Sequence, residues 1–125
     1  KMTVVNLQYG PIESSLEPLT KKAFENLYLP ECDLKNNMEE VFAIIKNCDL
    51  IVCPTTAIMI QAAALGVETI SYSPVYLPAS LDFERHTSDI FKHPWLNSVE
   101  IHKINNGNKA KTIEMIIERV IKRYN

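Results

Sequence analysis

The chain has 125 residues, of which 46% are hydrophobic and 22% are charged, and its formal net charge is −2 at pH 7. This length and composition indicate one globular domain with a hydrophobic core. The slightly acidic balance excludes a basic surface for nucleic acid or anionic lipid, and the apolar runs are too short for a transmembrane segment. Lys1 is an unusual first residue, so we expect residues 1–125 to be one domain cut from a longer protein.

In chain order, the hydrophobic pattern predicts a strand over 2–8, a helix over 15–27, a short strand over 27–30 and a helix over 37–48. It continues with a strand over 49–53, a helix over 56–65, strands over 68–73 and 98–103, and a closing helix over 108–125. The helix over 56–65 is apolar nearly all round, so we expect it to be covered on several sides. The closing helix is amphipathic, and its lysines and arginines alternate with glutamates, which is typical of a solvated face.

Strands that alternate with helices predict crossover units and a parallel sheet that is covered on both faces. The expected fold class is therefore α/β, a Rossmann-like doubly wound parallel sheet of about five strands with helices on both faces. The segment 74–97 is read as one long irregular loop with three prolines. A ligand-stacking role for Trp95 in this loop is weighed against a packing role under it, and the packing role is favoured.

The three cysteines give no sign of a disulfide or a zinc site. Their number is odd, no Cys-x-x-Cys spacing occurs, and Cys53 lies in an apolar run where cysteine is usually a small buried hydrophobe. None of the three histidines is paired at metal-ligand spacing. We therefore expect no metal and a reducing compartment, the cytoplasm.

The segment Pro54-Thr55-Thr56 lies between the strand over 49–53 and the helix over 56–65. In open parallel sheets, ligands bind at the carboxyl ends of the strands, and the start of a helix offers free N–H groups and partial positive charge to a phosphate. Ala57 is small enough for a close approach, and Gln61 is the one polar side chain within this helix. An ordinary N-cap by a threonine explains the same pattern, and the two interpretations are equally weighted. Neither a Gly-x-Gly-x-x-Gly nor a P-loop motif occurs.

Three motifs in order resemble the carboxyl-terminal half of heptosyltransferase-like glycosyltransferases of the GT-B fold, closest to versions fused behind tetratricopeptide repeats in bacteria. The first is "NLQYG" over 6–10, similar to the family's Leu-Gln-Tyr-Gly. The second is "DLIVCPTTAIMIQAAALG" over 49–66, similar to Asp-Leu-Val-Ile, then Asp-Thr-Ala, then His, then Ala-Gly-Ala-Leu-Gly. The third is "HPWLNSVEIHK" over 93–103, similar to Ser-Pro-Trp-Tyr-Pro-Ser-Val-Arg-Leu-Phe.

The resemblance implies a domain that binds a nucleotide diphosphate sugar, without a metal or other cofactor. The acceptor half or the helical repeats that would precede it are missing from the chain. Thr55, Thr56 and Ala57 would hold the diphosphate in an open cleft. The residues expected to line the same cleft are Gln8, Tyr9 and Gly10 on the first strand, Gln61 on the helix, and Ser73 and Pro74 on the next strand.

Two departures from the family pattern support a different hypothesis. Thr55 replaces the family's Asp and Ile60 its His, which removes groups able to orient a sugar or stabilise developing charge. The alternative is a catalytically inactive binding or interaction domain that keeps the fold. A signalling receiver is disfavoured, because the end of its first strand needs an acidic pocket and this chain has Asn6, Gln8 and Tyr9 there. The sequence does not give the sugar, the base or the acceptor.

Overall fold

The computed structural model describes residues 2–10, 26–73, 88–104 and 108–124. Its contacts divide into two compact units, Lys1–Ile44 and Ile45–Tyr124, and each is described by itself. The predicted helix over 15–27 lies almost entirely outside the described residues. Among the helices that are described, none has both the length and the apolar character needed to cross a membrane.

The first unit contains two short parallel strands, β1 (Val4–Val5) and β2 (Leu27–Tyr28). Both fall where the sequence predicts strands, but each has only two residues. The side chain of Asn6 folds back onto the backbone of Gln8, with its Nδ2 donating to the Gln8 carbonyl at 3.0 Å. The Asn6 amide still donates to the Tyr28 carbonyl at 3.0 Å, so the chain turns directly after its last contact with β2.

Helix α2 (Met38–Lys46) begins at an asparagine cap. The Asn37 side chain accepts a hydrogen bond from the amide of Glu40 at 3.3 Å, and acidic residues occupy the first turn, where they complement the helix dipole. Val41 and Ile45 lie one turn apart and are 1% and 0% exposed, so these two side chains face the core, whereas the neighbouring Phe42 is 38% exposed.

The second unit is built on a four-stranded sheet with the order β3-β4-β6-β5. Its strands are β3 (Ile51–Pro54), β4 (Thr69–Ser73), β5 (Ile90–Lys92) and β6 (Val99–Lys103). β3, β4 and β6 are parallel to one another, as expected from the alternation of strands and helices. The α/β class predicted from the sequence is therefore correct.

The sheet differs from the expected one in two ways. β1 and β2 form a parallel pair of their own instead of joining one sheet of about five strands. β5 lies inside 74–97, which the sequence analysis treats as irregular, and it pairs antiparallel with β6. Of its three residues only Phe91 is buried, and so short an edge strand gives too little alternation to be recognised in a sequence.

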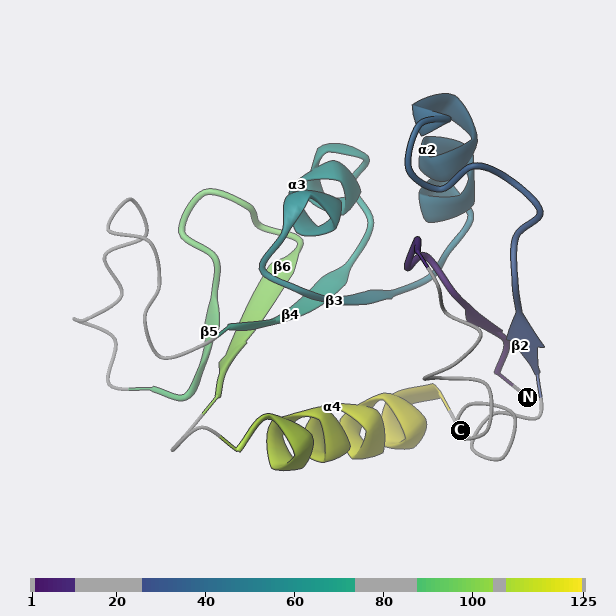
Figure 1. Ribbon diagram of the computed structural model, residues 1–125. Coiled ribbons are helices and arrows are strands. Elements are labelled where there is room, and N and C mark those ends of the chain that lie inside the picture. Colours follow the sequence, from purple (N-terminus) through teal and green to yellow (C-terminus); the bar gives the residue numbers. More distant parts are fainter. Residues whose placement is uncertain (1, 11–25, 74–87, 105–107, 125) are drawn as a thin grey trace. The chain divides into compact units, whose positions relative to one another are not determined.

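Helices α3 (Ala57–Ala64) and α4 (Lys109–Tyr124) cover opposite faces of this sheet (Figure 1). Side chains alternate between the two faces along each strand. Tyr72, Glu100 and His102 belong to the face under α4. The contacts of α4 with Tyr72 and Glu100 identify this face. Lys109 lies over the Tyr72 ring, and Arg119 donates to Glu100. The opposite set, on the α3 face, is Ile51, Cys53, Thr69, Ser71, Ser73, Val99 and Ile101, and all of these are buried.

Polar contacts attach α4 to its face of the sheet. Glu100 accepts hydrogen bonds from Arg119 at 3.0 Å and shares one with His102 Nε2 at 2.9 Å. Arg123 donates both guanidinium nitrogens to Glu68, and these bonds lower the pKa of that carboxyl. Arg123 lies in the last turn of α4, so it also complements the negative end of the helix dipole.

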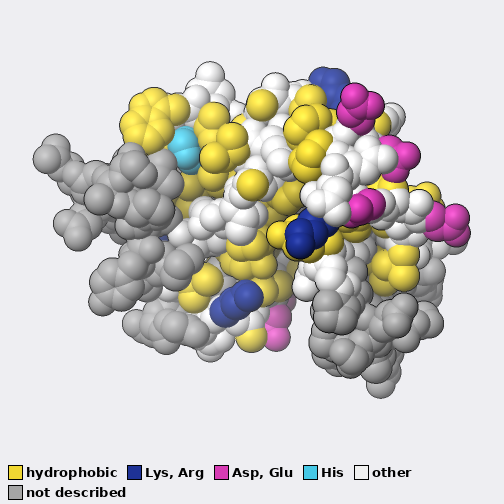
Figure 2. Space-filling view, turned by 45° about the horizontal axis from the view of Figure 1, so that its top comes forward, with side chains coloured by type: hydrophobic (Ala, Val, Ile, Leu, Met, Phe, Trp, Pro, Cys, Tyr) yellow, Lys and Arg dark blue, Asp and Glu magenta, His cyan; other side chains and the backbone are white. Residues whose placement is uncertain are grey.

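The apolar faces of α3 and α4 are covered less fully than the sequence suggests. In α3, Met59 and Ala62 are buried, but Ile60 is 58% exposed, so the helix is covered on the sheet side and open on the other. Figure 2 shows hydrophobic side chains at the surface on the side of the sheet that α3 covers. In α4, Ile116 is 1% exposed, whereas Ile121 is 42% exposed.

Replacing Ile116 by alanine should destabilise the fold by about 2–5 kcal/mol, because the side chain is fully buried and its removal leaves a cavity. Ile121→Ala is the matched control, since it makes the same change in the same helix at a partly exposed position, and it should cost about 1 kcal/mol or less. Urea unfolding followed by far-UV circular dichroism measures both. Equal losses in the two variants would contradict the described packing of α4.

Candidate functional site

The junction between β3 and α3 lies at the carboxyl edge of the parallel strands. β3 ends at Pro54, and the amide of Thr55 still donates to the Tyr72 carbonyl at 3.1 Å, so the ladder to β4 runs one residue further. Thr56 is the N-cap of α3, with the extended backbone angles φ −130° and ψ −176°. The threonine pair thus occupies the strand-to-helix transition at which the sequence analysis placed it.

The hydroxyl of Thr56 does not cap the helix that it precedes. It donates instead to the Pro54 carbonyl at 3.3 Å, and no side-chain hydrogen bond to the first-turn amides of α3 occurs within the described part of the chain. The Thr56 side chain is exposed. The Thr56 amide donates to the Pro54 carbonyl at 2.8 Å. The first amides inside a helix, here beginning with Ala57, have no partner within the helix, so this N-terminus presents N–H donors and partial positive charge at the sheet edge.

Thr55 is half-buried and contacts the neighbouring strand. Its hydroxyl donates to Ser73 Oγ at 3.3 Å, and Ser73 is 1% exposed. The Ser73 carbonyl accepts the amide of Ile104 at 2.8 Å, which ties the ends of β4 and β6 together. Parallel pairing has therefore brought together two of the predicted site residues that are 18 positions apart in sequence.

Gln61 lies in the middle of α3, away from the threonine pair in sequence. Its Oε1 is buried and has no hydrogen-bond partner among the residues that the structure describes. A buried polar atom without a partner is costly, so this oxygen needs a hydrogen-bond donor that the described residues do not supply. A role for Gln61 in ligand binding stays a prediction.

The remaining predicted site residues are in the first unit or outside the described residues. Gln8, Tyr9 and Gly10 are exposed residues of the first unit, and Tyr9 is 59% exposed. Gly10 has φ 105°, a left-handed conformation that favours glycine at the end of this segment. Pro74 lies outside the described residues. That all four line one cleft with Thr55 and Thr56 stays a prediction.

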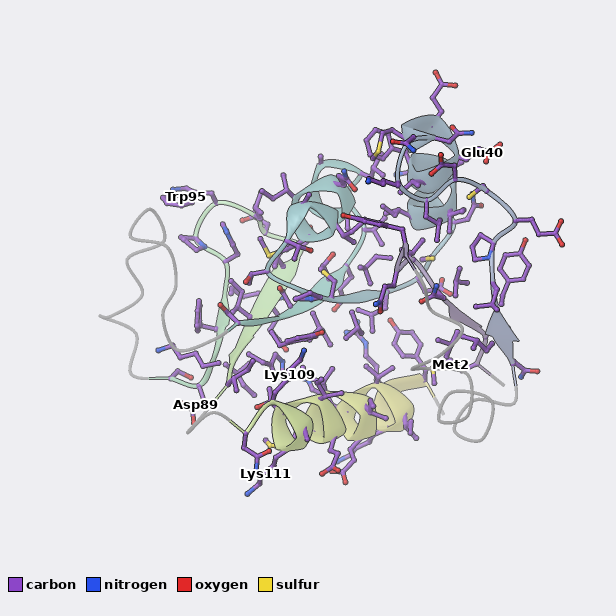
Figure 3. The ribbon with its side chains drawn as sticks, in the orientation of Figure 1. Met2, Glu40, Asp89, Trp95, Lys109 and Lys111 are labelled. Atoms are coloured by element: carbon purple, nitrogen blue, oxygen red, sulfur yellow. The ribbon has the colours of Figure 1, made fainter. Side chains whose placement is uncertain are left out.

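The packing role favoured for Trp95 is wrong, and its neighbour His93 has that role instead. Trp95 is 68% exposed and points outward from the loop between β5 and β6 (Figure 3), whereas His93 is 5% exposed. His93 Nδ1 accepts the amides of Trp95 and Leu96, each at 3.2 Å, and burial lowers the pKa of the ring. The imidazole therefore holds the loop in shape while the indole stays at the surface.

Two lysines that the sequence analysis did not single out lie at the same sheet edge. Lys103 is the last residue of β6 and is the register partner of Ser73, and Lys109 places its Nζ 5.6 Å from the centre of the Tyr72 ring. The sequence does contain a signal for Lys103. The predicted strands over 68–73 and 98–103 end on Ser73 and Lys103, so aligning the ends of parallel strands would have paired them.

The described residues contain no group of three or more histidine, cysteine or acidic side chains that could hold a metal ion. The arrangement at the β3–α3 junction consists of hydroxyls and backbone amides, which are ligands for an anion. No protein-family profile matches the chain, and no curated protein or solved structure is significantly similar to it. The family resemblance therefore rests on the three sequence motifs alone.

Cys53 lies on the α3 face of β3, next to this junction. Burial raises the pKa of its thiol to about 12, although contact with the Ser71 hydroxyl opposes this shift. At pH 8 the thiol is therefore protonated and shielded, and we expect it to react with iodoacetamide only after unfolding. Cys32 and Cys48 are partly exposed and should react faster. Mass spectrometry of labelled peptides over time measures all three rates, and rapid labelling of Cys53 in the folded chain would contradict its burial.

Proposed function

We propose that the chain is the donor-binding domain of a glycosyltransferase and binds a nucleotide diphosphate sugar. The observation that carries the proposal is the start of α3 at the carboxyl edge of the parallel strands. There Thr56 occupies the N-cap position without using its hydroxyl as a cap. In open parallel sheets this is the usual place for a phosphate ligand.

The chemistry of the junction suits a diphosphate that is bound without a metal. The amide of Ala57 would donate directly, and the helix dipole favours the negative charge. The Thr56 amide and the hydroxyls of Thr55 and Thr56 would exchange their present contacts with Pro54 and Ser73 for the phosphate. Ala57 is exposed and has no bulk to keep a ligand away. Ser73 and Pro74 would border the diphosphate from β4, while Gln8, Tyr9, Gly10 and Gln61 would contact the rest of the donor.

The wider architecture is part of the same proposal. The parallel β3-α3-β4 unit and the helices on both faces of the sheet support a Rossmann-like, doubly wound domain, one half of a GT-B fold. The acceptor would bind to an amino-terminal half or to helical repeats supplied by a longer cytoplasmic protein. In the reaction, the bond between the sugar's anomeric carbon and the diphosphate breaks, and a bond to an acceptor oxygen of a glycan, lipid or protein forms.

One observation favours a second candidate function, a binding domain without catalytic activity. Ile60 stands where the family has a histidine, and its side chain is 58% exposed on α3. Thr55 stands at the family's aspartate position and uses its hydroxyl to contact Ser73. The described residues of the β3–α3 junction, 54–57, thus contain no acid or base that could transfer a proton. Such a domain would still bind a nucleotide.

A substitution at the start of α3 tests the donor site. Ala57→Glu places a carboxylate where the phosphate would lie, and it should remove nucleotide binding without loss of fold, because an acid in the first turn suits the helix dipole. Ala57→Gln adds the same bulk without the charge and should weaken binding less. Thermal unfolding with a panel of nucleotides and nucleotide sugars measures binding, since a ligand at one hundred times its dissociation constant stabilises the fold by about 2.7 kcal/mol.

The control for that experiment is Ser98→Ala, which lies at the opposite edge of the sheet, just before β6. It should respond to nucleotides like the unchanged chain. If the unchanged chain responds to no nucleotide, the donor-site proposal is wrong. A response that Ala57→Glu retains in full would move the binding site away from α3.

The isolated chain should not transfer sugar, even where it binds a donor. The acceptor contacts and the closed cleft that orient the two reactants would come from the missing half. Incubation with radiolabelled nucleotide sugars and candidate glycan, lipid or peptide acceptors tests this. Transfer above the level of a boiled control would show that the chain is catalytically complete.

A further inference from the structure

The loop between β5 and β6 is closed by one histidine. The His93 Nδ1 atom accepts the amides of Trp95 and Leu96, each at 3.2 Å. At the other end of the loop, the amide of Val99 donates to the Leu96 carbonyl at 2.9 Å, and the amide of His93 donates to the Val99 carbonyl at 2.9 Å. The side chain and the backbone of His93 thus bind both halves of the loop.

This arrangement is the imidazole counterpart of an Asx turn. In an Asx turn, the side-chain oxygen of asparagine or aspartate accepts backbone amides a few residues ahead in the chain. In this loop Nδ1 of His93 takes the place of that oxygen, and Pro94, with its fixed φ angle, precedes the two donating amides. Asparagine does not titrate, whereas an imidazole takes up a proton close to neutral pH.

A proton on Nδ1 is incompatible with both of these hydrogen bonds. An acceptor nitrogen needs a free lone pair, so Nδ1 of His93 is unprotonated in this loop and the neutral ring has its proton on Nε2. In the imidazolium ion both nitrogens are donors, and the Nδ1–H group would point at two N–H groups. The conflict depends on Nδ1 alone, so a contact at Nε2 changes the pH at which it occurs and not its direction.

The charged groups of the described elements around the ring are on other faces or at other ends. By the alternation along β5, His93 belongs to the α3 face, and neither the loop nor α3 contains an acidic or basic residue besides His93 itself. The neighbouring charges on the strands, Glu68, Lys92 and Glu100, belong to the α4 face. Lys46 donates to the C-cap carbonyl of α3 at 2.8 Å.

We propose that His93 is a pH-dependent switch for the loop between β5 and β6, which is closed while the ring is neutral and opens when Nδ1 takes up a proton. Trp95 is 68% exposed on this loop, and β5 before it has only three residues. Opening therefore changes how the indole is presented at the surface, and it loosens the attachment of the edge strand.

The pKa of the ring gives the direction of the response. Histidine has an ordinary pKa of about 6.5, and burial lowers the pKa of His93 in the closed loop, so the ring is neutral at pH 7. The open loop binds a proton at higher pH than the closed loop does. The closed form is therefore fully stable above the ordinary histidine pKa, and it loses stability as the pH falls through the lowered pKa of His93.

His102, the other buried histidine of the described residues, should not open its surroundings in acid. Its Nε2 lies 2.9 Å from Glu100 Oε1, and a carboxylate only accepts hydrogen bonds, so Nε2 is the donor. The imidazolium ion keeps this donor, and protonation of His102 preserves the contact. The two buried rings therefore differ in their response to acid because one is an acceptor and the other is a donor.

Nitrogen-15 NMR of the 125-residue chain from about pH 7.5 to about pH 4.5 tests the switch, because this range spans the ordinary histidine pKa. The amide signals of Trp95 and Leu96 should shift together with the ring signal of His93. Their protection against hydrogen exchange, corrected for the intrinsic rate, should fall about tenfold, the size of one lost hydrogen bond. The amides of Ile101 and Ile116 should keep their protection, since β6 and α4 stay folded.

Three variants assign the response to Nδ1. His93→Asn supplies an oxygen that accepts the same amides without titrating, so the Trp95 and Leu96 amides should keep their protection over the whole pH range. His93→Ala removes the acceptor, and these amides should be poorly protected at both ends of the range. His102→Gln keeps a donor for Glu100 and should respond to acid like the unchanged chain.

Four results would overturn the switch. One is a His93 ring that titrates while the Trp95 and Leu96 amides stay protected, and another is a ring that stays neutral down to about pH 4.5. A third is the same acid response in His93→Asn as in the unchanged chain, since the response would then come from another group. The last is a loss of protection at Ile101 and Ile116 at the same pH as in the loop, because the acid transition would then be global unfolding.

Discussion

Parallel pairing of β3, β4 and β6 is the constraint on which the rest of the second unit depends. Because the three strands run in the same direction, their carboxyl ends meet at one edge. The chain returns from β3 to β4 through α3 on one face, and it enters β6 from β5, which runs the opposite way within the sheet. α3 and α4 cover the two faces, and both begin at the carboxyl edge. The burial of Ile101 and Val99 at 0% exposure follows from this two-sided cover.

The same constraint concentrates the polar groups of functional interest. Along β4 the hydroxyl side chains of Thr69, Ser71 and Ser73 are all buried on the α3 face, where most sheets of this class have larger apolar residues. The small side chains allow α3 to approach the sheet closely, and the last of them contacts Thr55. The proposed anion site thus combines strand ends and helix starts that are far apart in sequence. In the proposed function, donor binding and catalysis are separate properties, because residues 54–57 offer amides and hydroxyls to an anion but contain no acid or base that could transfer a proton.

The elements that sequence reasoning predicted correctly are those with strong periodicity or clear breakers. The apolar runs that became β3 and β4, the uniformly apolar α3 and the amphipathic α4 are all in place within a few residues. β5 was missed because a single inward residue, Phe91, does not make a pattern. The buried role of His93 and the exposed position of Trp95 were not predicted. The hydrogen bonds from two backbone amides to the His93 ring depend on the conformation of the loop, which the sequence pattern does not reveal. The position of Thr55 was predictable from the end of the apolar run. Its contact with Ser73 was not, because that contact depends on how β3 and β4 are aligned with each other.

The outward position of Trp95 gives the chain an optical property of its own. It is the one tryptophan in the sequence, and its indole is in water already in the folded state. Its emission should therefore change little when the core melts, and a denaturation curve that relied on it would miss most of the transition. The same indole is a sensitive reporter for anything that settles on the loop between β5 and β6, since covering it would shift its emission to shorter wavelength. Tryptophan fluorescence of this chain therefore reports on one surface loop and not on the core.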